Sequence, residues 1–451
     1  MSRPAVDVGA LLDGSPWTGY QKVLTALAAL AVIFDGFDIQ ILAFAIPSLI
    51  KDWNVSRADF GPVLGLGLAG MALGSPFAGY FGDRFGRRPT LIGCVGIFGL
   101  ATIATAFIDG LFGLAALRFV TGLGAGGALP NASALAAEFA PLRRRSAAVT
   151  LTIVCVPLGG MLGGLIAAQV LAPLGWRALY LIGGAGPLLY ALLLWFTLPE
   201  SPRFLARRPL QWHRLGQLLR RMGHSVGADE TFAEHAEQRR TGRVSVALLF
   251  SEEFGVGMAR DTAGLWIAFF FCLQGVYLIF GWLPALLSAQ GLGVATASSG
   301  LAAYNFGGVL GVLLWTVLAT LYGSKIPLMA GALGAAVSAL ALLFVPVRET
   351  SLLIFGIGIH GLFANAVQTS LYALATHVYP TRVRASGVAY CAAVGRAGAI
   401  LSSVFGAAII QAGSAAFWIT LAVCMTLAFA GLAWVRRHVS PSAQKMIQGR
   451  A

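Results

Sequence analysis

Four charged residues lie inside long apolar stretches of the sequence. Asp35 and Asp38 are three residues apart, so a helix would place both carboxylates on one face. Arg118 and Arg396 are the two cations. A charge at the centre of a membrane helix costs about 2.5–3.5 kcal/mol, so it normally faces a partner or a water-filled cavity. A carboxylate can carry a proton, and an arginine can bind a substrate carboxylate through two parallel hydrogen bonds. These residues therefore indicate a site for an anion and for protons.

The candidate proton-coupling residues are Asp38, Asp35 and His360. Either aspartate can serve, because burial favours its neutral form and a nearby arginine its charged form. Helical rise places Asp38 and Arg118 in the same outer half of the membrane, and Arg396 about 17 Å from the inner end of its span. The alternative is a structural role, as ion pairs for the four charged residues and as a hydrogen-bonded core residue for His360. Of the two aspartates, we consider Asp35 the stronger candidate for a structural ion pair.

Aromatic and amide side chains in the same stretches could complete a pocket. Small-molecule sites combine an apolar lining with a few placed polar groups. Membrane helices also use aromatic residues for packing, which is the alternative for each of these positions. The candidate substrate-binding residues, besides Arg118 and Arg396, are Phe37, Gln40, Asn131, Gln274, Tyr277, Tyr304, Asn305 and Gln368.

Composition and the length of the apolar runs predict what positions these residues. The chain has 451 residues, of which 57% are hydrophobic and 11% charged, and its mean hydropathy is +0.79. Soluble domains carry about 25% charged residues, and a helix needs about 20 apolar residues to cross a bilayer. We therefore predict an all-α integral membrane protein with twelve transmembrane helices, near 22–49, 60–81, 89–108, 112–137, 146–171, 177–198, 262–288, 298–321, 325–346, 350–377, 385–410 and 414–435.

The basic residues predict the orientation of these helices. Most of the 31 Lys and Arg residues fall in loops on one side of the predicted membrane, and the other loops hold only Lys51, Arg57, Arg177 and Arg348. Positive loops face the cytoplasm, so both termini should be cytoplasmic, in a bacterial inner membrane. The formal net charge of +13 is then a consequence of topology, and we expect no nucleic-acid partner.

The chain divides at a polar stretch. Residues 1–198 form a predicted N-terminal six-helix half, 199–261 a cytoplasmic amphipathic linker, and 262–451 a C-terminal six-helix half with a short tail. The five cysteines lie in predicted spans without paired spacing, so no metal or disulfide is expected. A glycine-rich run at 122–127 also lies inside a span, not between a strand and a helix, so we expect no dinucleotide site and no cofactor.

Loops on the cytoplasmic side could close the helix bundle at that end. After the second span, glycines permit a tight turn and Asp83 can meet an arginine or a helix N-terminus; the alternative is a basic loop that only sets topology. A motif with Glu138 and two arginines after the fourth span recurs with two arginines after the tenth, which indicates two pseudo-symmetric halves. In the second half Tyr322 stands opposite Asp83. The candidate gating residues are Gly79, Asp83, Arg84, Gly86, Arg87, Glu138, Arg143, Arg145, Arg382 and Arg384.

Several of these motifs resemble those of the major facilitator superfamily. The loop at 79–88, the arginine-glycine stretch at 118–127 and Pro199-Glu200-Ser201 are similar to its signatures. Asp35-Gly36-Phe37-Asp38 and Gly395-Arg396 resemble motifs of its aromatic acid:proton symporter family. The resemblance implies two six-helix halves that rock around a central site.

The resemblance to this family also implies a function. We expect a transporter, not an enzyme, that imports a benzoate-like or hydroxybenzoate-like carboxylate together with protons. The alternative is a proton-coupled antiporter that exports a hydrophobic compound or another small metabolite. The expected partners are the aromatic acid, protons and the lipid bilayer, with the monomer as the functional unit.

Overall fold

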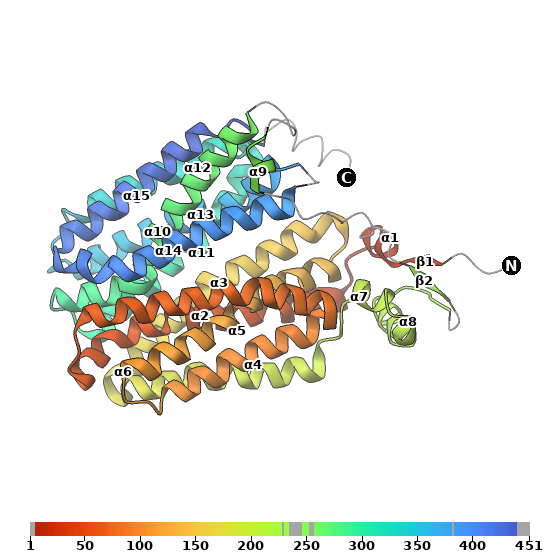
Figure 1. The fold of residues 1–451 in the computed structure, drawn as a ribbon, viewed down its shortest axis with the longest axis horizontal. Helices are drawn as coiled ribbons and strands as arrows, with labels where there is room; N and C mark the ends of the chain where they lie inside the picture. The colour runs from red at the N-terminus through yellow and green to blue at the C-terminus, as the bar shows by residue number, and fades with distance from the viewer. Residues whose placement is uncertain (1–4, 228–229, 234–245, 252–256, 381–382, 440–451) are drawn as a thin grey trace.

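The computed structural model describes residues 5–227, 230–233, 246–251, 257–380 and 383–439. These residues form a bundle of long helices (Figure 1). The long helices of the N-terminal half are α2 (Gly19–Trp53), α3 (Phe60–Phe85), α4 (Arg87–Thr105), α5 (Leu111–Phe139) and α6 (Arg145–Thr197). Those of the C-terminal half are α10 (Met258–Ala289), α11 (Val294–Tyr322), α12 (Lys325–Leu342), α13 (Thr350–Val378), α14 (Arg384–Gln411) and α15 (Ser414–Trp434).

Helix α6 accounts for two of the predicted spans. In the described part of the chain, 11 helices are long and apolar enough to cross a membrane. One of them, α6, has 53 residues, about 80 Å of helix, whereas the hydrocarbon core is about 30 Å thick. Gly175, with φ +75°, breaks its helical backbone, so the chain reverses there and crosses again. This confirms the prediction of twelve transmembrane helices.

The two halves lie side by side and diverge toward the end of the bundle that carries both termini, which we call the terminal end (Figure 1). Near the opposite end α3 packs closely against α14. A Cβ on Gly61 would lie 2.8 Å from the carbonyl oxygen of Val404. The halves are therefore in contact at one end and separated at the other.

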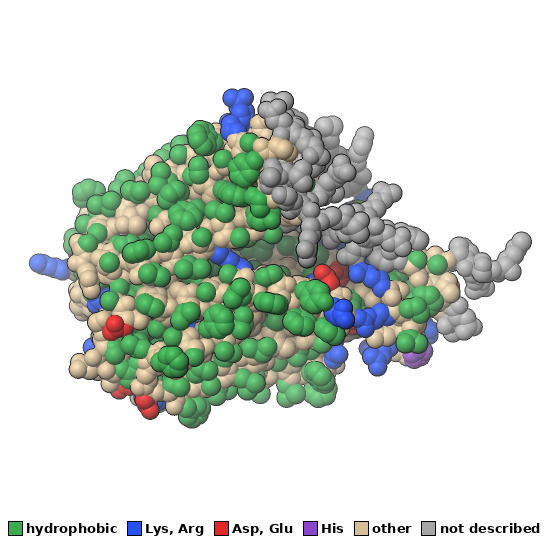
Figure 2. Space-filling view, in the orientation of Figure 1, with side chains coloured by type: hydrophobic (Ala, Val, Ile, Leu, Met, Phe, Trp, Pro, Cys, Tyr) green, Lys and Arg blue, Asp and Glu red, His purple; other side chains and the backbone are tan. Residues whose placement is uncertain are grey.

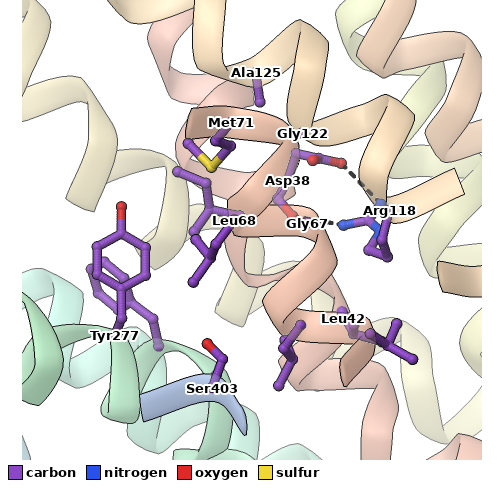
Figure 3. Close-up of a pocket in the computed structure, with 15 residues that line it drawn as sticks. Asp38, Leu42, Gly67, Leu68, Met71, Arg118, Gly122, Ala125, Tyr277 and Ser403 are labelled. Atoms are coloured by element: carbon purple, nitrogen blue, oxygen red, sulfur yellow. Dashed lines mark hydrogen bonds and ion pairs between the residues drawn. The ribbon is translucent and has the colours of Figure 1, made fainter. Parts of the chain in front are cut away.

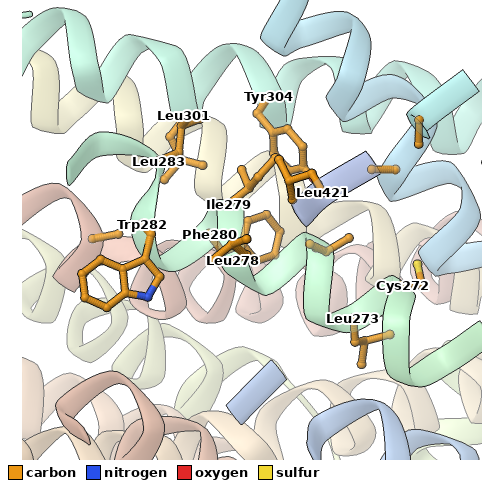
Figure 4. Packing of buried hydrophobic residues seen from close by; sticks show 14 of the residues in the cluster. Cys272, Leu273, Leu278, Ile279, Phe280, Trp282, Leu283, Leu301, Tyr304 and Leu421 are labelled. Atoms are coloured by element: carbon orange, nitrogen blue, oxygen red, sulfur yellow. The ribbon is translucent and has the colours of Figure 1, made fainter. Parts of the chain in front are cut away.

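Apolar side chains cover most of the surface visible in Figure 2, and the charged ones gather toward the ends of the bundle. The interior of the C-terminal half is also apolar. There Phe280 and Tyr304 pack edge to face at 5.8 Å (Figure 4). Trp282 donates its indole hydrogen to the Ser403 carbonyl at 3.1 Å. A helix that is apolar on both its inner and its outer faces is expected where the outer solvent is lipid.

Short elements lie at the terminal end, most of them against the N-terminal half. They are β1 (Val6–Asp7), α1 (Val8–Asp13), α7 (Pro202–Ala206), α8 (Trp212–Arg221), β2 (Phe232–Ala233) and, near the C-terminal half, α9 (Val246–Leu249). Strands β1 and β2 pair in parallel, and α8 buries Leu215, Leu218 and Leu219. The start of the chain is thus joined to the segment between the two halves.

Candidate functional site

A buried ion pair joins α2 to α5. The Asp38 carboxylate lies 3.3 Å from the Arg118 guanidinium, and the two side chains are 5% and 6% exposed. Arg118 also donates to the Asp38 carbonyl at 3.2 Å, and Thr102 of α4 donates its hydroxyl to the carboxylate at 2.6 Å. Tyr180 places its ring 5.6 Å from the Arg118 guanidinium. Three helices therefore fix one carboxylate inside the N-terminal half.

Asp35 lies on the same helix, one turn nearer the terminal end. It is buried, and within the described part of the chain its Oδ1 atom has no hydrogen-bond partner. The sequence reasoning weighted Asp35 more as the ion-pair partner, and this was wrong, because the side chain that meets Arg118 is Asp38. Asp35 instead lies within electrostatic reach of Asp38 and Arg396.

Arg396 reaches from α14 across to the N-terminal half. Its Nη1 donates to the Met71 carbonyl of α3 at 3.2 Å, and among the residues that the structure describes it forms no ion pair. Its charge also acts on Tyr277 and Tyr372 of the C-terminal half. A cation with a backbone carbonyl as its hydrogen-bonded partner keeps guanidinium donors available for an anion.

A small pocket between the halves contains the Asp38–Arg118 pair (Figure 3). Asp38, Arg118 and Met71 line it from the N-terminal half, and Tyr277 and Ser403 from the C-terminal half. The remaining lining is apolar or glycine, and comprises Ile39, Leu42, Val63, Leu64, Gly67, Leu68, Gly122, Ala125, Phe280 and Gly281. An apolar pocket with a few charged and hydroxyl groups suits a small amphipathic molecule.

A groove of about 580 Å³ separates the halves at the terminal end. Arg145 and Thr150 line it from α6, and Ser324 and Tyr372 from the C-terminal half. Tyr372 also lies within electrostatic reach of Arg396. The groove therefore has lining residues from both halves, one of which is near Arg396.

Gln40 and Asn305 form a reciprocal amide pair between the halves. The Asn305 amide donates to the Gln40 oxygen at 2.7 Å, and the Gln40 amide donates in return at 3.2 Å. Both residues are buried. Gly160 lies over the pair, and a Cβ there would meet both side chains. In this state the two amides satisfy each other.

The other candidate substrate contacts lie apart from the Asp38 pocket. Phe37 packs against Gly163 and Gly183. Asn131 joins α5 to α3 by donating to the carbonyls of Ala78 and Gly127. Gln274 and Gln368 are half-buried, and Gln274 leaves its Oε1 without a partner among the described residues.

Tyr304 and His360 form a separate group in the C-terminal half, with ring centres 6.0 Å apart. His360 is buried, and its Nδ1 lies 3.0 Å from the Ser338 hydroxyl and 3.1 Å from the Ala335 carbonyl. The structure does not bring His360 to the pocket that holds Asp38.

The candidate gating residues of the N-terminal half form a chain of contacts at the terminal end. Arg87 lies 2.5 Å from Asp83 and 3.8 Å from Glu138. Glu138 in turn accepts a hydrogen bond from the Ser201 hydroxyl. These contacts connect α3, α4 and α5 to the segment after α6, and we call Asp83, Arg87, Glu138 and Ser201 the latch.

Glu200 caps the first turn of α4 beside the latch. Its Oε1 accepts the backbone N–H groups of Arg87 at 3.0 Å and Arg88 at 3.2 Å. Burial raises the pKa of Glu200 above its usual range, and the amide hydrogen bonds oppose that effect. Gly86 has φ +117°, and a Cβ there would strike the Glu200 carboxylate.

The remaining gating candidates take different places. Arg145 pairs with Asp13 of α1, and Arg203 lies 3.0 Å from the same carboxylate. In the C-terminal half, Arg384 donates to the Tyr379 carbonyl at 3.2 Å. Of the other candidates, Arg84 and Arg143 are exposed, Gly79 is half-buried, and Arg382 lies outside the described residues.

Sequence reasoning missed several partners of the candidate residues. Thr102, Tyr372, Asp13 and Ser201 each contact or lie near a predicted site residue. Thr102 carried a weak signal, as a hydroxyl within an apolar span. Asp13 ends the short helix α1 and Ser201 lies in the loop after α6, and the spatial neighbours of such short segments cannot be read from spacing.

The major facilitator superfamily model matches residues 28–259 and 265–449. The chain is similar to a gallate transporter from Pseudomonas putida, with 36% identity over 90% of each chain. It is also similar to the 4-hydroxybenzoate transporter PcaK from Pseudomonas aeruginosa, with 34% identity over 91% of this chain and 92% of that one.

A solved structure of the E. coli xylose transporter XylE in a partially occluded inward-open conformation superimposes with a TM-score of 0.71. It covers 92% of this chain and 97% of that chain at 19% identity, which supports the fold alone. Two matched segments that together span nearly the whole sequence, and relatives above 30% identity along it, establish the family. The chain belongs to the major facilitator superfamily, a family of membrane transporters.

Proposed function

We propose that the protein imports an aromatic carboxylate together with protons across the bacterial cytoplasmic membrane, with both termini in the cytoplasm. The relatives named for gallate and 4-hydroxybenzoate transport support the substrate class. Both of these compounds are ring carboxylates that carry hydroxyl groups. A site for them needs a cation for the carboxylate and a lining that accepts an aromatic ring.

The observation that carries the proposal is the environment of Arg396. Its guanidinium lies between the halves, bonded to the Met71 carbonyl and without an ion pair among the described residues. A substrate carboxylate can supply the missing charge through two parallel hydrogen bonds. Tyr277 and Phe280, whose rings are 5.5 Å apart, offer aromatic contacts in the adjoining pocket.

Asp38 is the proposed proton carrier. Its carboxylate already has Arg118 and Thr102 as partners, so gaining a proton would weaken the ion pair between α2 and α5. Protonation of Asp38 would in this way change how α2 packs against α5 inside the N-terminal half. Asp35, one turn away and near Arg396, would transmit the charge of the substrate site to Asp38.

Alternating access follows from the two ends of the bundle. We infer that the site opens to the cytoplasm through the groove at the terminal end, because Tyr372 lines that groove and lies within electrostatic reach of Arg396. The opposite conformation requires the halves to close at this end, where the latch residues lie. One copy of the chain supplies both halves of the site, so we propose that the monomer is the functional unit.

Reconstituted vesicles test this function. With the outside acidic, we expect vesicles to accumulate labelled 4-hydroxybenzoate, benzoate or gallate above the outside concentration, and a protonophore to abolish the accumulation. D-Xylose is the control substrate, for which no accumulation is expected. Extrusion of the aromatic acid, or accumulation that ignores the pH gradient, would contradict proton-coupled import.

A further inference from the structure

A second cavity lies at the terminal end of the N-terminal half, away from the transport site. It has a volume of about 420 Å³ and lies where α4 and α6 end against the linker helix α8. Arg88 lines it from α4, and Arg214 and Arg221 from α8. Figure 1 shows α8 just beyond the ends of the membrane helices, which is the level at which phospholipid head groups lie.

The three arginines leave this cavity with excess positive charge. Within the ranges given above, none of Arg88, Arg214 and Arg221 has an ion pair. Glu200, the one carboxylate among the described lining residues, already accepts backbone N–H groups at the start of α4. Arg88 donates to the Trp195 carbonyl, and its Nε is buried without a described partner. The cavity therefore offers guanidinium donors to an anion.

The arrangement of α8 directs two of these charges into the cavity. Arg214, Leu218 and Arg221 of α8 all line it, and their spacing of three or four residues places them on one helical face. Arg220 follows Leu219 on another face and is not among the lining residues. The same helix thus carries a matched arginine that points elsewhere.

An exposed apolar strip runs from the cavity along α6 into the membrane region. Leu189, Leu192, Leu193 and Phe196 recur at helical spacing and are 69%, 57%, 46% and 78% exposed. Phe196 also lines the cavity, and the adjacent Trp195 ring lies 5.5 Å from the Arg88 guanidinium. A ligand that fits both features has an anionic head and apolar chains.

We propose that this cavity binds the head group of an anionic phospholipid, with the phosphate held by Arg88, Arg214 and Arg221 and the acyl chains lying along the exposed face of α6. Basic residues beside membrane helices are suited to such head groups. The chemistry of a phosphate alone would also match a soluble anion. The continuous apolar strip favours the lipid, because a soluble anion would make no use of it.

Native mass spectrometry of the purified full-length protein can test the site. The probe is dioleoyl phosphatidylglycerol, with dioleoyl phosphatidylcholine and inorganic phosphate as comparison ligands. We expect Arg214→Ala and Arg221→Ala each to weaken phosphatidylglycerol binding about fivefold, since each basic residue near the surface contributes about that factor. Arg220→Ala removes the same charge from the same helix and should change binding by less than about twofold.

Three results would overturn the proposal. Equal loss in Arg220→Ala would indicate general surface attraction. Equal binding of phosphatidylcholine would indicate contact with the chains alone. Displacement of the lipid by inorganic phosphate would identify a soluble-anion site. Size-exclusion profiles and melting temperatures identical to those of the unmodified protein would show that the variants are folded, so that a loss of binding reports on the cavity.

Discussion

The Asp38 carboxylate and the Arg118 guanidinium lie 3.3 Å apart inside the N-terminal half, although 80 residues separate them in the sequence. Both side chains are almost fully buried. Removing one partner of such a pair leaves an uncompensated buried charge, which costs several kcal/mol. Neutralising Asp38 by a proton would therefore alter the contact between α2 and α5. This change would link proton binding to helix packing.

Replacing Asp38 by asparagine tests its proposed role in coupling. Asparagine keeps the shape of the side chain but cannot gain or lose a proton. We expect Asp38→Asn to lose accumulation driven by a pH gradient and to retain counterflow, in which the loaded carrier exchanges substrate. Uptake and counterflow would be measured on the same vesicles. Asp35→Asn is the matched variant, and accumulation that survives in Asp38→Asn would shift the coupling role to another residue.

Arg396 should be required for binding the substrate anion. We expect Arg396→Ala to abolish uptake, and Arg396→Lys to recover little because lysine cannot form a forked contact with a carboxylate. A charged hydrogen bond contributes about 1.5–3 kcal/mol, so affinity should fall about tenfold or more. Calorimetry with 4-hydroxybenzoate measures the loss directly. Arg348→Ala, at an exposed site, serves as control, and normal affinity in Arg396→Ala would remove Arg396 from the site.

The latch should control the rate of transport more than the assembly of the protein. Asp83 is 62% exposed where it meets Arg87, so its contribution to stability is small. We expect Asp83→Asn to insert normally and to transport much more slowly. The unmodified protein has Tyr322 at the position opposite Asp83, so we expect full function without Tyr322→Asp. Initial uptake rates normalised to expression would show this. Asp59→Asn makes the same change before α3, and unimpaired transport by Asp83→Asn would indicate that the loop only sets topology.

Two glycines of α3 should differ sharply in their tolerance of a methyl group. A Cβ on Gly74 would strike the backbone of Leu123 in α5, whereas none of the described atoms that were compared lies within 4 Å of one on Gly79. Overpacking typically costs about 1–3 kcal/mol. We expect Gly74→Ala to lower the melting temperature of the detergent-purified protein and Gly79→Ala to leave it unchanged. Equal melting temperatures would show that α3 and α5 can separate at little cost.

Glu200 should make stability depend on pH. Burial raises its pKa in the folded protein, so the folded state binds this proton more tightly than the unfolded chain does. The stability that results is complete below the unfolded pKa and is lost as the pH rises through the folded pKa. Glu200→Gln keeps an oxygen for the α4 amides but does not titrate. Melting curves at several pH values above about 4 should therefore show a smaller decline for the variant, and identical slopes would contradict this.

Much of the fold could be predicted from the sequence alone. Twelve spans follow from hydropathy, because crossing a bilayer imposes a length and an apolar composition on each helix whatever its neighbours are. Even the reversal within α6 was predicted, as the break between the spans at 146–171 and 177–198. The charges within these spans could also be identified as site candidates, since their cost in lipid demands a partner.

Tertiary structure decided which partners those charges have. Asp35 and Asp38 share one helical face, and spacing does not say which of them meets Arg118; the positions of α4 and α5 select Asp38, through Thr102 and Arg118. The contact of Arg396 with Met71 depends on how far the two halves have separated. The partner of Arg145 is Asp13 in a short N-terminal helix. Periodicity describes one helix at a time, whereas these contacts depend on the relative rotation and translation of several helices, which only their packing determines.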